Sequence, residues 1–392
     1  MYAKEKGTCV PNMWNFVLSS VSIPAFGSET GPLLGDDLAR DTIIDANTAI
    51  STKVMSEAKE WLKSNYEEFY DIRNIRAHIT KQVDMKEKSR YTVSLYCETM
   101  YKYNSVEEIP FVQGLMSIYD RRNISKKEQD VLNSQIKQIA EDAAFGEYTE
   151  LFVDVVVEID NIDDSVPYKM YYQDGIDTTL HEINLLKLDS QELYSSGVKC
   201  AEFVMESISD AVETESITET RGYADYDRFA ARDYARTYSS NATGCNKCAA
   251  GACNILQNTL KWNTAEYPYF SVFLHNDCAD FISQAMSEGG IPEKSGWYRD
   301  KNGASGTWTQ SWTVVPKLET YMTRSDHVYW DESTFAACNA GNILITNSGE
   351  HIVMVDFNDG TTHKFTGHTN DRKSYVFGNA STYQYYVINR SS

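Results

Sequence analysis

A cysteine begins a short predicted helix within the segment HNDCADFISQAMSEGG, residues 275–290. Asn276 or Asp277 supplies the N-cap of this helix, and two glycines followed closely by a proline end it. The N–H groups of the first turn and the positive end of the helix dipole therefore point at the sulfur of Cys278. Such a position lowers the pKa of a thiol, and the same N–H groups can hold an oxyanion. The alternative is a small side chain packed under the helix, because the cysteine lies on its apolar face.

A predicted hairpin near the C-terminus supplies the histidines that a catalytic thiol needs. Residues 351–368, HIVMVDFNDGTTHKFTGH, contain Asp359–Gly360, which is a strong signal for a two-residue turn. With these two residues as the loop, His351 lies directly opposite His368 across the two strands, where one imidazole can orient the other. The alternatives for such a pair are a structural role or half of a metal site.

The cysteine and the two histidines together predict acyl transfer. We expect Cys278 to attack a carbonyl carbon, His351 to take its proton and return one to the leaving amine, and His368 to fix the ring of His351. Substrate and oxyanion binding is expected from polar residues near the cysteine and from tryptophans that wall a cleft. Core packing is the alternative for the tryptophans, because each indole must bury a large area. The expected binding residues are Asp277, Asn276, Trp308, Trp312 and Asn370.

The chain is long enough for two domains, and its composition changes along it. Residues 1–50 form an N-terminal segment, in which residues 13–26 resemble a signal peptide remnant; the alternative is a segment that packs against the protein. Residues 51–210 are expected to form an acidic accessory domain of helices and an antiparallel sheet. A linker rich in Thr, Ser and Glu at 211–221 leads to an α+β domain at 222–392, in which helices precede a small antiparallel sheet.

Apolar periodicity predicts the main elements of both domains. Helices are expected at 51–72, 126–143, 223–238 and 312–322, in addition to the cysteine-bearing helix. Strands are expected where apolar and polar residues alternate, at 75–83, 91–100, 150–159, 181–188, 342–346, 351–357, 361–368 and 383–389.

The charge of the chain excludes some classes of partner. The formal net charge is −20, most of it placed before residue 222, and no basic stripe is present. Nucleic acid and anionic lipid are therefore not expected as partners. No apolar run approaches the length of about 18 residues that a membrane-spanning helix needs, so we expect no membrane span.

The eight cysteines leave their own chemistry open. Cys245, Cys248 and Cys253 lie close together, and Cys338 lies far downstream. Disulfides, reduced thiols and a metal site are all alternatives, but the second CxxC pair that is typical of zinc ribbons is missing. We expect no metal and no cofactor.

The segments YDRFAARDYARTY, YPYF, NDCADFISQAMSEGGIP, GTWTQSWTVV, AGNILI, HIVMVD and GHTNDR follow one another within residues 222–392. In this order they resemble the putative amidase domain of bacterial proteins, a family related to the NlpC/P60 and CHAP cysteine peptidases. The resemblance implies a papain-like α+β fold, a nucleophile at Cys278, a histidine at His351 and a polar third residue at His368. It also implies peptides of the bacterial cell wall as the substrate class.

These observations predict a secreted or cell-surface cysteine amidase or peptidase that cleaves an amide bond through a thioester, in peptidoglycan peptides. A cytoplasmic location is left open. The alternative function is a catalytically silent cell-surface binding protein that keeps the amidase fold.

Overall fold

A computed structural model describes most of the chain after residue 48. The described residues are 49–121, 124–160, 168–172, 180–183, 189–215, 226–241, 261, 263, 265–267, 277–299, 308–324, 329–346, 349, 351–369, 371–378 and 383–388. Within them the protein is a mixed α+β structure with eight α-helices, one short 3₁₀-helix and an eleven-stranded sheet, so the predicted α+β class is confirmed. None of the described helices is long and apolar enough to cross a membrane.

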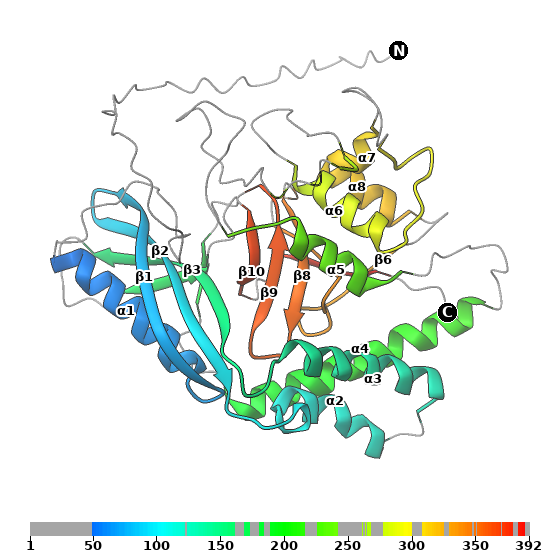
Figure 1. Ribbon diagram of the computed structural model, residues 1–392, viewed down its shortest axis with the longest axis horizontal. Coiled ribbons are helices and arrows are strands. Elements are labelled where there is room, and N and C mark those ends of the chain that lie inside the picture. The colour runs from blue at the N-terminus through cyan, green and yellow to red at the C-terminus, as the bar shows by residue number, and fades with distance from the viewer. Residues whose placement is uncertain are drawn as a thin grey trace, which may run out of the picture. The chain divides into compact units, whose positions relative to one another are not determined.

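The first half of the described chain consists of long antiparallel strands with helices packed against them (Figure 1). The predicted helices at 51–72 and 126–143 and the first three predicted strands are present, while α2, α4 and β4 were not predicted. Its elements are α1 (Ala49–Tyr66), β1 (Tyr70–Asp84), β2 (Lys88–Tyr101), the 3₁₀-helix η1 (Val106–Glu108), α2 (Pro110–Arg121), α3 (Lys126–Asp142), β3 (Thr149–Asp160), β4 (Lys169–Tyr172), β5 (His181–Glu182) and α4 (Ser190–Glu215).

The second half places helices before strands, as the sequence predicts. The four predicted strands are present, and β6 and β10 are additional. Its elements are α5 (Arg228–Thr237), α6 (Cys278–Glu288), α7 (Gln310–Thr313), α8 (Val315–Met322), β6 (Trp330–Glu332), β7 (Ile343–Ile345), β8 (Ile352–Asn358), β9 (His363–Gly367), β10 (Arg372–Val376) and β11 (Gln384–Ile388). The side chain of Asp227 caps α5 by accepting hydrogen bonds from two N–H groups of its first turn, which confirms the predicted helix start.

One sheet runs through both halves of the described chain. Its strand order is β1-β2-β3-β10-β9-β8-β7-β11-β6, and β4 pairs with β3 and with β5. β3 and β10 join in parallel, with Phe152 opposite Tyr375, whereas the other pairs of described strands are antiparallel. The division into an accessory domain at 51–210 and an amidase domain at 222–392 stays a prediction, and α4 extends to Glu215, inside the segment expected as the linker.

The register predicted for the β8–β9 hairpin is wrong. Asn358 pairs with His363, so the loop holds four residues, and a bulge between Val355 and Phe357 shifts the later pairs to Val355 with Phe365. The carboxylate of Asp359 causes the longer loop, because its Oδ1 accepts hydrogen bonds from the N–H groups of the second and third residues after it, at 2.9 and 2.6 Å. His351 and His368 are consequently not directly opposite each other.

Alternate residues of β8 enter different cores. Ile352 and Met354 pack with α6 in one buried cluster, while Val353 and Val355 pack with the aromatic residues of β9, β10 and β11 in another. Helices α5 and α6 lie over the face formed by β8 and β9 (Figure 1). The start of α6 therefore lies beside the ends of the two strands that carry the predicted histidines.

Candidate active site

Cys278 is the first residue of α6 and only 7% of its surface is exposed. Its sulfur accepts hydrogen bonds from the backbone N–H of Ile352, at the start of β8, and from that of Ala279 in its own helix. The side chain of Thr369 is also within hydrogen-bonding contact of the sulfur. The thiol is thus held between the first turn of α6 and the ends of β8 and β9.

The pKa of Cys278 contradicts the expectation from its helix position. Burial raises the pKa of this thiol to about 11; the three hydrogen bonds to the sulfur lower it, and the charge of Asp277 raises it further. The position at the helix N-terminus is as predicted, but withdrawal from water has the larger effect. At neutral pH the sulfur is therefore protonated, and a nucleophilic attack requires a base at the moment of reaction.

His351, the predicted base, directly precedes the residue whose N–H binds this sulfur. That residue is Ile352, so the backbone of His351 lies beside the start of α6. The residue is 3% exposed, and its carbonyl accepts a hydrogen bond of 3.0 Å from the N–H of Thr346. The predicted nucleophile and the predicted base thus come from neighbouring backbone segments, although 73 positions separate Cys278 from His351 in the sequence.

His368 forms a buried pair with Asp277. Its Nδ1 lies 2.7 Å from Oδ2 of Asp277, and its Nε2 lies 2.7 Å from the carbonyl oxygen of Tyr238. Both partners can only accept hydrogen bonds, so both ring nitrogens must carry a proton. Burial lowers the pKa of His368, but the charges of Asp371 and Asp277 and the two hydrogen bonds outweigh it and raise the pKa to about 9. His368 is thus an imidazolium at neutral pH, with partners other than the His351 ring that the register predicted.

The side chain of Asp277 does not cap α6. Asp277 occupies the N-cap position, but its carboxylate makes no hydrogen bond to the helix and binds His368 and Thr369 instead. Phe281, one turn into α6, stacks on the His368 ring with centroids 3.6 Å apart and planes 9° apart. A carboxylate on one edge and an aromatic ring on one face therefore fix the imidazolium against the start of the helix.

Thr369 is a site residue that sequence reasoning did not single out. Its hydroxyl accepts a hydrogen bond of 3.0 Å from the N–H of Asp277 and donates one of 3.3 Å to Oδ1 of the same residue. Its φ of 62° lies in the left-handed region, which β-branched residues rarely adopt. Strain of this kind is typical of functional sites, and here it brings one hydroxyl to both Asp277 and Cys278. The only sequence signal was its position directly after His368.

A buried polar layer supports α6 from below. Asp280 is fully buried and pairs with Arg299, and its other oxygen accepts a hydrogen bond of 2.8 Å from the indole N–H of Trp312. Burial raises the pKa of Asp280 to about 6, and Arg299 limits the rise. Gln284 donates a hydrogen bond of 2.9 Å to Asp280 and accepts one of 2.7 Å from the hydroxyl of Tyr234. As a residue past the first turn, it therefore supports the helix.

The other predicted binding residues have different outcomes in the structure. Trp312 has no exposed surface and packs on Trp297, so it occupies the core position that was the alternative to a cleft wall. Trp308 is partly exposed and forms a β-bridge with Arg299. Asn276 and Asn370 lie outside the described residues, so their predicted contact with substrate remains a prediction.

The cysteines outside the site are partly described. Cys338, Cys97 and Cys200 are reduced and fully buried, so Cys338 takes the reduced-thiol alternative. Cys245, Cys248 and Cys253 lie outside the described residues. Among the residues with described positions, no group of three or more His, Cys, Asp or Glu side chains is arranged to hold a metal ion.

The geometry defines a class of site: a buried thiol at a helix start, a histidine at the adjoining strand end, and a carboxylate–imidazolium pair beside them. Comparison with known proteins gives one family match for this part of the chain. Residues 225–388 match the family model described as the putative amidase domain, so this part of the chain is similar to that family. No curated protein matched the chain, and no solved structure matched it.

Proposed function

We propose that the protein is a cysteine amidase or peptidase that hydrolyses an amide bond through a thioester at Cys278. The observation that carries the proposal is the hydrogen bond from the N–H of Ile352 to the sulfur, because it fixes the thiol beside the strand end that bears His351. The family match to an amidase domain over the same residues supports the same chemistry.

The first half of the reaction forms the thioester. His351 takes the proton of Cys278 as the sulfur bonds to the amide carbon, and N–H groups of the first turn of α6 hold the resulting oxyanion. The tetrahedral intermediate then collapses: the C–N bond breaks, and the nitrogen leaves as an amine with the proton from His351. Because the pKa of Cys278 is raised, transfer of its proton to the base is part of the attack.

The second half releases the acyl group. Water takes the place of the amine, His351 removes one of its protons, and the water oxygen bonds to the thioester carbon. Breakage of the C–S bond returns the proton to the sulfur and gives a carboxylic acid product. The enzyme is then ready for another cycle.

His368 acts as a positioning residue in this account. As an imidazolium it neutralises the charge of Asp277, which stands directly before the nucleophile and disfavours a sulfur anion. Thr369 completes this arrangement, since its hydroxyl contacts both Asp277 and the sulfur.

Peptidoglycan peptides are the proposed substrate class, and the cell surface of a bacterium is the proposed location. Support comes from the relation of the amidase family to peptidases of the NlpC/P60 and CHAP type, and from the acidic charge, which disfavours nucleic acid.

The test is the release of new amino groups from purified peptidoglycan by the wild-type protein and by the Cys278→Ala variant. The Cys97→Ala variant is the matched control, because Cys97 is also a buried thiol but lies in β2. The proposal expects release by the wild type and by C97A, and a loss of at least about a thousandfold in C278A. No release by the wild type from peptidoglycan or from a panel of peptide amides supports the silent binding protein instead.

A further inference from the structure

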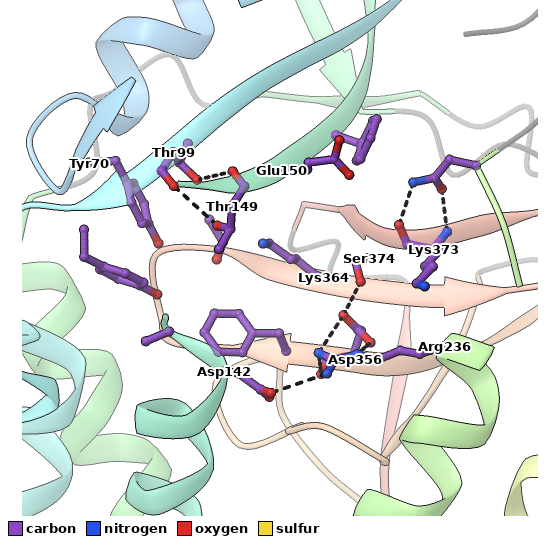
Figure 2. Close-up of a pocket in the computed structure, with 16 residues that line it drawn as sticks. Tyr70, Thr99, Asp142, Thr149, Glu150, Arg236, Asp356, Lys364, Lys373 and Ser374 are labelled. Carbon is purple, nitrogen blue, oxygen red and sulfur yellow. Dashed lines mark hydrogen bonds and ion pairs between the residues drawn. The ribbon is translucent and has the colours of Figure 1, made fainter. Parts of the chain in front are cut away.

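A cavity of about 230 Å³ lies away from Cys278, where the sheet passes from β3 to β10 (Figure 2). Its walls come from the strands β1, β2 and β3 on one side and β8, β9 and β10 on the other, with the ends of α3 and α5 closing it. Segments from both halves of the chain thus build one partly open cavity, and the proposed catalytic site does not account for it.

Most polar groups of this cavity are already paired within the protein. Arg236 binds Asp356 at 2.5 Å and Asp142 at 3.3 Å, and Ser374 donates to Asp356 at 2.7 Å (Figure 2). The hydroxyl of Tyr70 donates to Asp359 at 2.7 Å. These side chains already have partners within the protein, so they have little remaining capacity to bind a charged ligand.

Lys364 is the exception. Its side chain lines the cavity from β9 and is largely buried, yet its ammonium has no hydrogen bond and no ion pair with any residue of the described chain. The nearest interactions are with the ring of Phe357, whose centroid lies 5.6 Å from Nζ, and with the charges of Asp356 and Asp359 at longer range. A charged group withdrawn from water without a partner is costly, which is why such groups are rare outside binding sites.

We propose that this cavity binds a small monocarboxylate, with Lys364 as the cation that receives the carboxylate. The volume fits a molecule of a few heavy atoms, and Lys373 at the rim adds a second positive charge along the approach (Figure 2). A carboxylate at Nζ would give the buried ammonium of Lys364 a partner that the described residues do not supply, in a charge-assisted hydrogen bond.

The charges around Lys364 favour a monoanion over a dianion such as phosphate. Asp356 and Asp359 act on the ammonium, and Glu150 lies at the exposed rim. Each carboxylate repels a second negative charge on the ligand. The hydroxyl of Ser374 already donates to Asp356, so it does not offer its proton to phosphate oxygens.

The test uses saturation-transfer NMR of the full-length protein with propionate and alanine as probes, at constant ionic strength. The Lys364→Met variant removes the ammonium and keeps a flexible apolar chain, so it should fold. The Lys81→Met variant is the matched control, because Lys81 is an exposed lysine of β1 outside the cavity. The Cys278→Ala variant separates this site from the proposed catalytic site.

The proposal expects wild type, K81M and C278A to bind at least one of the two probes, and K364M to bind it about tenfold or more weakly. Added inorganic phosphate should not displace the probe at matched ionic strength. The proposal is overturned by an absence of binding to the wild type, by equal binding to K364M, by displacement with phosphate, or by loss of binding in C278A. Each of these results is independent of whether the protein hydrolyses peptidoglycan.

Discussion

Asp277 and His368 form a buried ion pair immediately before the nucleophile, with Oδ2 and Nδ1 2.7 Å apart. The pair joins the start of α6 to the end of β9, which are 91 positions apart in the chain. It therefore stabilises the contact between helix and hairpin on which the whole site depends.

The ion pair predicts a pH-dependent stability. In the folded protein the pKa of His368 is about 9, above its ordinary value of 6.5. The folded state thus keeps a proton that the unfolded chain loses above about pH 6.5, so this stabilisation is complete below pH 6.5 and disappears as the pH rises to about 9. The contribution of this proton to the free energy of unfolding is on the order of 3 kcal/mol.

Urea unfolding at pH 6, 7.5 and 9 measures this effect. The Asp277→Asn variant should show a smaller decrease in unfolding free energy over that range, by about 1 kcal/mol or more, because its His368 has a lower pKa. Parallel pH profiles of wild type and D277N would mean that the pair does not hold the proton.

The raised pKa of Cys278 predicts how the thiol reacts with an alkylating agent. Because the pKa is about 11, labelling by iodoacetamide should be slow at pH 7 and should accelerate about tenfold per pH unit up to pH 10. Among the four described cysteines, Cys278 should be labelled first, because the other three are fully buried. Peptide mapping after timed labelling measures both effects. A rate that is independent of pH between 7 and 9 would indicate a preformed thiolate and contradict the account.

A histidine substitution tests the base. His351→Ala should lower kcat/KM by about 10² to 10⁴, because the protonated thiol then has no group to receive its proton. His78→Ala is the control, since His78 is an exposed residue of β1 and its loss should leave the rate unchanged. Steady-state kinetics with a peptide amide measure both, and a fully active H351A would remove His351 from the mechanism.

The tip of the β8–β9 hairpin is held by the first half of the chain. Gly360 has a φ of 81°, and a Cβ placed there would lie 2.6 Å from the ring of Phe111 in α2. Gly146 has the same φ of 81° with no atom within 4 Å of such a Cβ. Gly146→Ala should therefore cost only the strain of the left-handed backbone, about 1 kcal/mol, while Gly360→Ala should cost a further 1–3 kcal/mol from the clash.

Thermal or urea unfolding of the two glycine variants gives the comparison directly. Equal destabilisation of both variants would show that the hairpin tip does not pack against α2. A larger cost for G360A, together with reduced activity at temperatures where wild type is folded, would show that the first half of the chain helps to hold the catalytic hairpin.

The sequence predicted the elements that local signals define. The helix of Cys278 follows from its polar start and its glycine stop, and Gly290 indeed has a φ of 98°. Helix α4 was missed because Gly197 interrupts its pattern. In the structure Gly197 lies so close to α2 that a Cβ would meet the carbonyl oxygen of Phe111 at 2.0 Å, so the glycine serves helix packing rather than helix ending.

The details that sequence could not give depend on tertiary contacts. The observed hairpin register differs from the predicted one for two reasons. Asp359 accepts hydrogen bonds from N–H groups of its own loop, and Asp356, at the bulge, binds Arg236 of α5. The pKa of Cys278 is raised, not lowered as predicted, because burial outweighs the effect of the helix N-terminus. Burial depends on the packing of segments that are distant in the sequence. The parallel pairing of β3 with β10 likewise could not be predicted, because neither strand carries a local sequence pattern that specifies its partner.

The most direct test of the central claim is a search for the thioester itself. Wild-type protein and C278A are mixed with a peptidoglycan peptide, quenched in acid within the first turnover, digested and mapped by mass spectrometry. The account predicts the acyl part of the substrate on the peptide that contains Cys278, and none on C278A. Turnover of the substrate by C278A at the wild-type rate, with no adduct on the wild type, would contradict it.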